Sequence, residues 1–345
     1  MTETPDAVVT SALDAVARRR DLSAEEAGAV LGRIMSGEVS QVQIAGFLIA
    51  LRTKGETVEE VVGFARTMRS LATPVAVPRA EELLDTAGTG GGRPSFNVST
   101  TAALIATGAG CVVAKHGNRS ATSLSGSADL LEALGARIDL APAGVGRCIE
   151  ETGFGFMFAP AHHRATRFVV PVRKSLGVRT IFNLLGPLTN PAGAGCQLIG
   201  VSDRSFAEVI AGALRALGAR RALVVSSDDG LDELSAAAPT QVIEVDGEEI
   251  RRYTVTPAEL GVTGGDAVPA GTPAENAATT RAILGGEAGP SRAVAVINAA
   301  AAIYAAGRAE SIADGVELAR RAIDDGSAGD ALEGFISASH RHAPA

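Results

Sequence analysis

The sequence of 345 residues contains no Trp, and only 3% of its residues are aromatic, so rings contribute little to its core. With 46% hydrophobic residues, the interior must be built from Ala, Val, Leu and Ile. The length allows two domains, or one large domain with an appendage. The three cysteines, Cys111, Cys148 and Cys196, lie far apart without a CxxC pair. This spacing indicates buried thiols in a reducing compartment rather than disulfides or a metal site.

Long apolar runs and an excess of positive charge are also missing. The most apolar stretch, 293–306, is interrupted by Asn298 and is shorter than the roughly 18–20 residues that a membrane span needs. The first ten residues, MTETPDAVVT, lack the basic and apolar parts of a signal peptide. The net charge of −8 argues against nucleic-acid binding but still allows a small anion to be held locally. We therefore expect a cytoplasmic protein that acts on small molecules, without a membrane or nucleic acid as partner.

The first 72 residues are predicted to form a small helical domain. Three hydroxyl residues are each followed three positions later by Glu or Gln, the capping-box pattern of a helix start: Ser23–Glu26, Ser40–Gln43 and Thr57–Glu60. Gly37 and Gly55 stand where the first two of these helices should end. We expect about four helices, followed at 72–78 by a hinge whose two prolines cannot continue a helix.

From about Leu83 onward, short apolar runs alternate with Ala-rich helical segments, which is typical of a mostly parallel sheet covered by helices on both faces. The expected strands are 111–114, 154–159, 197–202 and 222–226, and Asp246-Gly247 marks a hairpin over 242–255. The expected helices are 100–108, 128–135, 145–152, 206–218, 274–284, 292–306, 312–324 and 331–339. The predicted fold class is α/β, with a larger α/β domain over 79–345 hinged to the helical domain.

A glycine-rich segment, DTAGTGGG at 85–92, comes just before SFNVST at 95–100, which opens a helix. Glycines let the backbone approach a ligand closely, and the free N–H groups of a helix start attract anions. The two together predict a phosphate cradle, whereas the glycine-rich turn alone is also compatible with a purely structural role. In sheets of this kind, ligands bind where loops leave the carboxyl ends of the strands.

Two further loops follow predicted strands. The segment KHGNRSATS at 115–123 brings two cations, an amide and several hydroxyls to the exit of a core strand, and a solvated surface loop explains this cluster poorly. The acidic segment DDGLDE at 228–233 offers the hard oxygen ligands that Mg²⁺ prefers, although such loops are often only solvated turns.

The fourth segment runs from Phe158 through His162-His163 and Arg173 to FNLLGPLTNP at 182–191. Adjacent histidines lack the i, i+4 spacing of a helical metal site, and GPLTNP indicates a rigid, buried turn. The four loops together require a ligand with several phosphates, a metal ion, and an organic acid for a spare arginine. Phosphoribosyl transfer meets this description, since it stabilises a departing pyrophosphate beside an oxocarbenium-like centre and needs no covalent nucleophile.

In this order and at these separations, the motifs GTGG, NVST, KHGNR, GPLTNP and GLDE resemble those of the anthranilate phosphoribosyltransferase family over nearly the whole chain. The resemblance implies transfer of phosphoribose from phosphoribosyl pyrophosphate (PRPP) to the amine of anthranilate, the second step of tryptophan biosynthesis from chorismate. It also implies Mg²⁺, with two ions per subunit. The helical domain would form a homodimer, with part of 163–190 joining the interface.

The family's motifs also imply roles for individual residues. PRPP contacts are expected at Gly88, Gly91, Gly92, Ser95, Asn97, Val98, Ser99, Thr100, Lys115, His116, Gly117, Asn118, Arg119, Ser120, Ala121, Thr122, Ser123 and Ser127. Anthranilate is expected to meet Gly88, Asn118 and Arg173, with pocket walls formed by His116, Pro160 and His163. Mg²⁺ is expected at Ser99, Asp232 and Glu233. The role of Arg173 is physically reasonable, because a guanidinium pairs well with a carboxylate.

One departure from the family concerns Gly92, since the motif normally reads GTGGD and Gly92 follows Gly91 here. The stretch to Asn97 is also one residue short, so the Asp is either replaced or deleted, and PRPP or Mg²⁺ affinity could differ from the family norm. Two alternatives to the transferase are a pyrimidine nucleoside phosphorylase and a non-catalytic paralogue that binds a nucleotide or nucleic acid. The intact Asp232-Glu233 pair weighs against both, and the negative charge weighs against the second.

Overall fold

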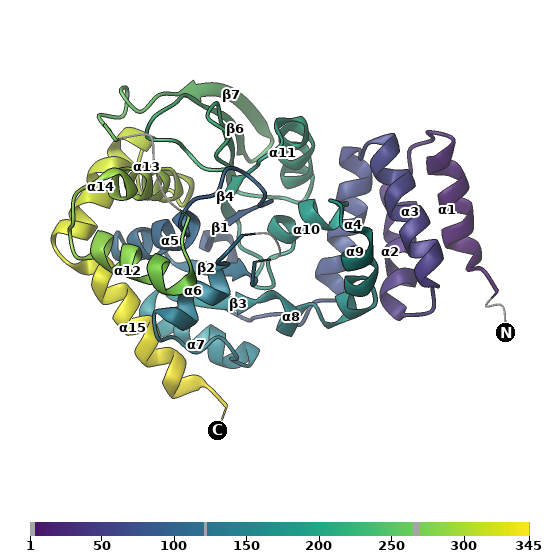
Figure 1. The fold of residues 1–345 in the computed structure, drawn as a ribbon, viewed down its shortest axis with the longest axis horizontal. Coiled ribbons are helices and arrows are strands. Elements are labelled where there is room, and N and C mark those ends of the chain that lie inside the picture. Colours follow the sequence, from purple (N-terminus) through teal and green to yellow (C-terminus); the bar gives the residue numbers. More distant parts are fainter. Residues whose placement is uncertain (1–3, 121–122, 265–269, 345) are drawn as a thin grey trace.

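The computed structural model describes residues 4–120, 123–264 and 270–344, which form a helical module beside a larger α/β domain (Figure 1). The first described residues lie at the free end of the helical module, and the last described residues lie at the bottom of the α/β domain in this view (Figure 1). Among the described residues, no helix combines the length and the apolar character required to cross a membrane.

The helical module consists of α1 (Ala7–Ala17), α2 (Ala24–Ser36), α3 (Gln41–Lys54) and α4 (Val58–Ser70). The capping boxes predicted at Ser23 and Thr57 are both present, and Gly37 ends α2 in the left-handed conformation that glycine adopts easily. The third predicted box is only half formed. The Gln43 N–H donates to Ser40 Oγ at 3.3 Å, but the Gln43 side chain is turned to the backbone of Asp6.

The predicted hinge at 72–78 contains no helix and is tied to the segment that follows the third strand. The Thr73 N–H donates to the His162 carbonyl at 2.8 Å, and His162 Nδ1 donates back to the Thr73 carbonyl at 2.9 Å. The Val75 N–H donates to the Pro191 carbonyl at 3.0 Å. These bonds hold the connection between module and domain against the segment that also contributes to the site.

A seven-stranded sheet in the order β3-β2-β1-β4-β5-β6-β7 forms the centre of the α/β domain. Its strands are β1 (Leu84–Gly88), β2 (Val113–Gly117), β3 (Phe154–Phe158), β4 (Cys196–Gly200), β5 (Arg221–Ser227), β6 (Thr240–Asp246) and β7 (Glu249–Val255). The first five in this order pair in parallel, and β6 with β7 forms the predicted antiparallel hairpin. The α/β class with a mostly parallel sheet is thereby confirmed.

Alternate residues of the sheet point into two apolar cores, as the two-residue period of a strand requires. Leu198 and Leu223 belong to one core, whereas their neighbours Ile199 and Val224 belong to the core shared with the helical module. The first core is covered by α5 (Val98–Gly108), α6 (Ser127–Ala133), α7 (Pro142–Thr152), α12 (Pro273–Leu284), α13 (Pro290–Ala305), α14 (Ile312–Asp324) and α15 (Ser327–His342). On the other face, α11 (Ala207–Ala216) packs between the sheet and α4 (Figure 1).

The segment between β3 and β4 is more helical than predicted. It contains α8 (Ala159–His162), α9 (Val170–Leu176) and α10 (Phe182–Leu188), and short 3₁₀ helices occur at η1 (Ala80–Glu82), η2 (Arg164–Phe168) and η3 (Arg204–Phe206). The prediction of a turn throughout GPLTNP was wrong up to Leu188, because α10 includes Pro187. Thr189 Oγ1 donates to the Leu185 carbonyl at 2.9 Å, which satisfies a carbonyl at the end of this helix.

Two helices of this segment, α9 and α10, contribute apolar side chains to the core of the helical module. Val172 of α9 and Leu185 of α10 are among the buried residues there, as is Val169 just before α9. This packing is relevant to the expectation that part of 163–190 accompanies the helical domain. The division at 1–72 and 79–345 stays a prediction.

The central strand β1 is absent from the predicted strands, because Asp85 and Thr86 interrupt the apolar pattern of a buried strand. Backbone pairing of β1 with β2, both fully described, is limited to Leu84 with Val113. Beyond that pair, the Asp85 carboxylate accepts the His116 N–H at 3.0 Å and so replaces a ladder bond.

Asn190 completes this polar cluster from the GPLTNP motif. Its Nδ2 donates to Asp85 Oδ2 and to the Ala114 carbonyl, both at 2.8 Å. All these groups are buried, so the hydrogen bonds are needed to offset their desolvation. The two central strands thus diverge around buried polar groups at the edge of the sheet where ligands are expected.

Candidate functional site

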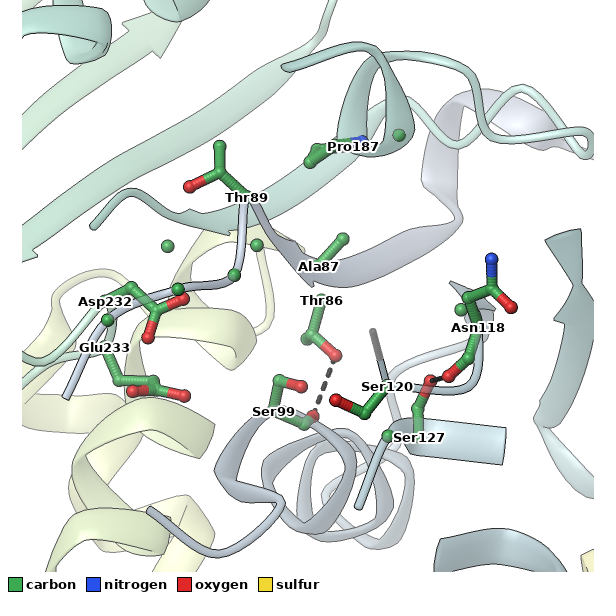
Figure 2. A pocket seen from close by; sticks show the side chains of 18 of the residues that line it. Thr86, Ala87, Thr89, Ser99, Asn118, Ser120, Ser127, Pro187, Asp232 and Glu233 are labelled. Carbon is green, nitrogen blue, oxygen red and sulfur yellow. Dashed lines mark hydrogen bonds between the residues drawn. The ribbon is translucent and has the colours of Figure 1, made fainter. Parts of the chain in front are cut away.

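A cavity of about 740 Å³ opens at the carboxyl ends of β1, β2, β4 and β5 (Figure 2). Its lining comes from the glycine-rich turn after β1, the loop after β2, the acidic loop after β5, and residues of α8 and α10. The four segments singled out in the sequence therefore meet at one place, as expected for a parallel sheet.

The glycine-rich turn forms one wall of the cavity. Gly90 and Gly91 have φ angles of 63° and 84°, a region in which residues with a Cβ are disfavoured. Just beyond the turn, α5 begins without a side-chain cap, because Asn97 Oδ1 instead accepts from Ser125 Oγ at 2.9 Å and from Asn276 Nδ2 at 2.8 Å. The first N–H groups of α5 are therefore suited to an anion, and Ser99 in this first turn lines the cavity.

Lys115 is the buried cation of the site. Its Nζ donates to the carbonyl oxygen of Thr86 and, at 3.1 Å, to the Thr86 hydroxyl, and it lies 3.4 Å from Ser99 Oγ. Burial lowers the pKa of Lys115 to about 8, although the nearby Asp85 carboxylate opposes this shift. Burial likewise raises the pKa of Asp85 to about 6, and Lys115 opposes that shift in turn. The pair therefore places a positive charge beneath the cavity floor with a negative charge behind it.

The loop after β2 is anchored on α6. Arg119 Nη1 donates to Asp129 at 2.8 Å, and its Nη2 donates to Glu132 at 2.9 Å, so the guanidinium is already bound to two carboxylates. Asp129 also accepts the N–H groups of Gly126 and Ser120, at 2.9 and 3.2 Å. The loop residues that line the cavity are Gly117, Asn118, Arg119, Ser120, Ser123, Gly126 and Ser127. The predicted contacts Ala121 and Thr122 lie outside the described residues.

The acidic loop after β5 brings Asp232 and Glu233 side by side into the cavity (Figure 2). Burial raises the pKa of Asp232 above its ordinary value. Burial, followed by the negative charge of Asp232, raises the pKa of Glu233 well above its ordinary range. Two carboxylates so close in a poorly hydrated place need a shared proton or a cation.

A divalent cation fits this pair. Glu233 Oε2 is buried without a hydrogen-bond partner among the described residues, which leaves an acceptor available to a metal. In the same described ranges, no three His, Cys, Asp or Glu side chains gather as a metal site. Two carboxylates that rely on substrate oxygens and water for the remaining ligands are typical of Mg²⁺. Ser99 lines the same cavity (Figure 2).

Gly92, the departure from the family motif, lies against Asp232. A Cβ built on Gly92 would lie 2.5 Å from Asp232 Oδ1 and 2.9 Å from its backbone N. A Cβ on Gly200 would lie 1.7 Å from the Asp232 carbonyl oxygen. The contacts of a Cβ on Gly92 are too short to be tolerated, so an Asp at position 92 would require the acidic loop to move. Gly200 likewise leaves no room for a Cβ beside the Asp232 carbonyl.

The side of the cavity next to α10 is neutral. His116 Nδ1 donates to the Gly186 carbonyl at 3.2 Å, and its ring lies 5.1 Å from that of His163. Burial lowers the pKa of His116 to about 3 and that of His163 to about 4, so both are uncharged at neutral pH. Both Nε2 atoms are buried and lack partners within the described part of the chain. Pro187 and Ala159 complete this wall.

Several predicted contacts lie outside the lining, namely Ser95, Asn97, Val98, Thr100, Pro160, His163 and Arg173. Val98 and Thr100 are buried within α5. Arg173 lies on α9 with its guanidinium 5.5 Å from the Phe182 ring, and its Nη2 lies 3.5 Å from Asn183 Oδ1. Because Asn183 does line the cavity, one side chain separates Arg173 from it.

Sequence reasoning missed Asn183 and Arg179, both of which line the cavity. Asn183 Oδ1 accepts the Thr180 N–H at 3.0 Å, so it also shapes the start of α10. A signal for Arg179 was available. It is a cation placed just after Gly177, the left-handed glycine that ends α9, and just before FNLLGPLTNP.

Comparisons with known proteins cover nearly the whole chain. Residues 80–329 match the α/β domain of the glycosyl transferase family, and residues 10–72 match its helical bundle domain. The chain is 51% identical to the anthranilate phosphoribosyltransferase of Rubrobacter xylanophilus, covering 97% of this chain and 98% of that relative. It is 50% identical to the enzyme of the same name from Symbiobacterium thermophilum, covering 94% and 96%.

Solved structures agree with these matches. The anthranilate phosphoribosyltransferase of Thermus thermophilus superimposes with a TM-score of 0.90 at 46% identity, covering 95% of this chain and 99% of that one. The enzyme of the same name from Saccharomyces cerevisiae, in complex with PRPP and Mg, gives a TM-score of 0.89 at 26% identity, covering 97% and 99%.

Proposed function

The chain belongs to the anthranilate phosphoribosyltransferase family, and on that premise we propose how its cavity transfers phosphoribose from PRPP to the amine of anthranilate. The products are N-(5-phosphoribosyl)anthranilate and pyrophosphate. The observation that carries the proposal is the meeting of the glycine-rich turn, the start of α5, Lys115 and the Asp232-Glu233 pair in one cavity. A nucleoside phosphorylase, with one phosphate, has no need of that carboxylate pair, and a binding paralogue needs no such machinery.

The PRPP site is assigned to the predicted residues that line the cavity. They are Gly88, Gly91, Gly92, Ser99, Lys115, His116, Gly117, Asn118, Arg119, Ser120, Ser123 and Ser127. Asn97 would support this site indirectly, since its amide holds the loop after β2 through Ser125. Arg119 would do the same through Asp129 and Glu132, because its charge is already matched by these carboxylates.

Mg²⁺ would be held by Asp232 and Glu233 with Ser99 nearby, at two ions per subunit. The bound ions would neutralise charge on the pyrophosphate of PRPP. The fit rests on the buried, unpartnered Glu233 oxygen and on the need of the two adjacent carboxylates for a cation.

In the reaction, the bond between the anomeric carbon and pyrophosphate breaks while a carbon–nitrogen bond forms, and the amine loses a proton. Backbone N–H groups of α5 and the Lys115 ammonium would hold the departing pyrophosphate. The neutral walls at His116 and Pro187 would accept the anthranilate ring and exclude water. Gly88 and Asn118, which line the cavity, would meet both substrates, and Arg173 would reach the anthranilate carboxylate beside Asn183. No covalent nucleophile is required.

The proposal is tested by following the fluorescence of anthranilate in the presence and absence of PRPP. We expect consumption of anthranilate only when PRPP and Mg²⁺ are both present. Phosphate-dependent cleavage of uridine or thymidine is measured in parallel. Cleavage of a nucleoside without any consumption of anthranilate would overturn the proposed function in favour of a phosphorylase.

A homodimer through the helical module is the second part of the proposal. Val42 on α3 is 82% exposed, and Val8, Ile49, Val170 and Val178 are also exposed on α1, on α3 and around α9. Exposed apolar side chains near one another often mark an interface. Val42→Glu is expected to shift sedimentation from dimer to monomer, whereas Glu59→Gln on α4 serves as a control. A wild-type monomer at micromolar concentration would exclude this interface.

A further inference from the structure

Arg179 lies between α9 and α10, and its guanidinium binds the backbone of the glycine-rich turn. Its Nη1 donates to the Gly90 carbonyl at 2.8 Å and to Ser202 Oγ at 2.9 Å, and its Nη2 donates to the Thr89 carbonyl at 3.3 Å. A Cβ on Gly91 would lie 2.5 Å from the same Nη1. The guanidinium therefore packs directly on the backbone of the turn, where only glycine leaves room.

These bonds fix the orientation of two peptide planes. In a trans peptide the carbonyl and the following N–H point in opposite directions. With the Thr89 carbonyl held by Arg179, the Gly90 N–H points away from the guanidinium and toward the Asp232 carboxyl, whose pKa it helps to lower against the larger effect of burial. By the same geometry, the Gly91 N–H points away from Arg179 and Ser202. Glycines have no side chains that would restrict the rotation of these peptide planes. Hydrogen bonds from Arg179 can therefore determine the direction in which the planes face.

Ser202 and the helical module support the hydrogen bonds that Arg179 makes to the glycine-rich turn. Ser202 Oγ donates to the Gly90 carbonyl at 2.9 Å, so two side chains share one acceptor. Behind Arg179, Arg52 Nη1 of α3 donates to the Arg179 carbonyl at 2.8 Å. The glycine-rich turn is thus connected through a single residue to the helical module.

We propose that Arg179 is a positioning residue for the phosphate-bearing substrate. It holds the Thr89 and Gly90 carbonyls outward so that the N–H groups of Gly90 and Gly91 face Asp232 and the cavity. The substrate class, a sugar carrying pyrophosphate, rests on the proposed function. Arg179 acts through the turn and need not touch the substrate.

The test compares Arg179→Ala and Arg179→Lys with Lys174→Ala, which removes an exposed cation nearby on α9. We expect Arg179→Ala to raise the Michaelis constant for PRPP about tenfold, which corresponds to about 1.4 kcal/mol. The constant for anthranilate should change less than about twofold, and Lys174→Ala should change neither. Arg179→Lys keeps a donor and should recover part of the PRPP affinity, which a loss of folding would not explain.

Hydrogen–deuterium exchange of peptides covering 86–92 supplies a readout independent of activity. Exchange in this segment should be faster in Arg179→Ala than in the wild type and unchanged in Lys174→Ala. Since Ser202 holds the same Gly90 carbonyl, the effects of Arg179→Ala and Ser202→Ala on PRPP should also be non-additive in the double variant.

Three results would overturn the proposal. They are an unchanged PRPP constant in Arg179→Ala, an effect confined to anthranilate, or additive effects of the Arg179 and Ser202 variants together with unchanged exchange at 86–92. Either of the first two results would show that Arg179 does not serve the phosphate-bearing substrate. The third result would show that Arg179 acts independently of the glycine-rich turn. Absence of any transfer by the wild-type protein would instead refute the proposed function.

Discussion

The two sides of the cavity are built on different principles. On the phosphate side, Lys115, Asp232 and Glu233 are ionisable groups; Lys115 is held by a backbone carbonyl, and Asp232 lies against glycines that allow close contact. On the opposite side, the neutral His116 lines the cavity, and the neutral His163 packs against it outside the lining. The Nε2 atoms of both lack partners among the described residues. The first side is organised before a ligand arrives, whereas the second offers shape and unused acceptors.

This difference indicates how one cavity can separate two anionic substrates. Desolvated charges discriminate strongly by sign and charge number, so the side with cation and metal sites should select the polyphosphate. A neutral pocket discriminates mainly by shape and by a few hydrogen bonds, which suits a flat aromatic ring. Changes on the charged side should therefore have larger effects than changes on the neutral side.

The largest expected effect follows removal of the paired carboxylates. Asp232→Asn combined with Glu233→Gln keeps the shapes but removes both charges that a divalent cation requires. Turnover should fall by more than about 100-fold, the loss typical of removing one group that stabilises a transition state electrostatically. Steady-state rates at saturating PRPP and circular dichroism provide the measurement and the folding control. Wild-type rates in excess EDTA would contradict the metal requirement itself.

Substitution of one cation on each side should next separate the two substrates. Arg173→Ala is expected to weaken anthranilate binding by about ten- to a hundredfold, because a hydrogen bond to a charged group contributes roughly 1.5–3 kcal/mol. Lys115→Ala should raise the constant for PRPP instead. Both Michaelis constants and the melting temperature are measured for each variant. If Arg173 only ties α9 to Phe182 and Asn183, both constants and the melting temperature will change together.

Local patterns in the sequence were sufficient for much of the fold. The caps at Ser23 and Thr57, the four strands and the hairpin depend on residues within a few positions of one another, so they are visible without the structure. Strand β1 could not be predicted from local patterns, because its Asp85 is stabilised by His116 and by Asn190. Asn190 is more than a hundred residues away in the sequence.

The same reason explains what was missed at the site. Four loops could be placed together because they leave adjacent strands of one parallel sheet. Arg179 was not identified, because its partners Gly90 and Ser202 are distant in sequence, two of its three acceptors are backbone carbonyls and the third is a common hydroxyl. Likewise, the contact of Gly92 with Asp232 is a packing fact that no local pattern encodes.

A third prediction concerns Gly92 on the charged side. Gly92→Ala would place a Cβ 2.5 Å from Asp232 Oδ1, so the carboxylate must shift. We expect the Mg²⁺ concentration for half-maximal rate to rise by about tenfold, comparable to losing a group that orients a metal ligand. Gly32→Ala in α2 is the matched control, since a Cβ there meets nothing within 4 Å. An unchanged Mg²⁺ requirement in Gly92→Ala would show that the acidic loop adapts freely.

The smallest expected effect is a pH dependence confined to one substrate. Burial lowers the pKa of Lys115 to about 8, so its charge is present below that pH and is lost above it. Between about pH 7 and 9, kcat/KM for PRPP should therefore fall by up to about tenfold, because this ratio reports ionisations of the free enzyme. The kcat/KM for anthranilate should not change over the same pH range, because His116 and His163 are already neutral there. Lys115→Gln removes the titrating group, and its lower kcat/KM should show no such fall. Persistence of the fall in Lys115→Gln would assign the ionisation to another group, and a parallel fall for anthranilate would contradict the separation of the two sides.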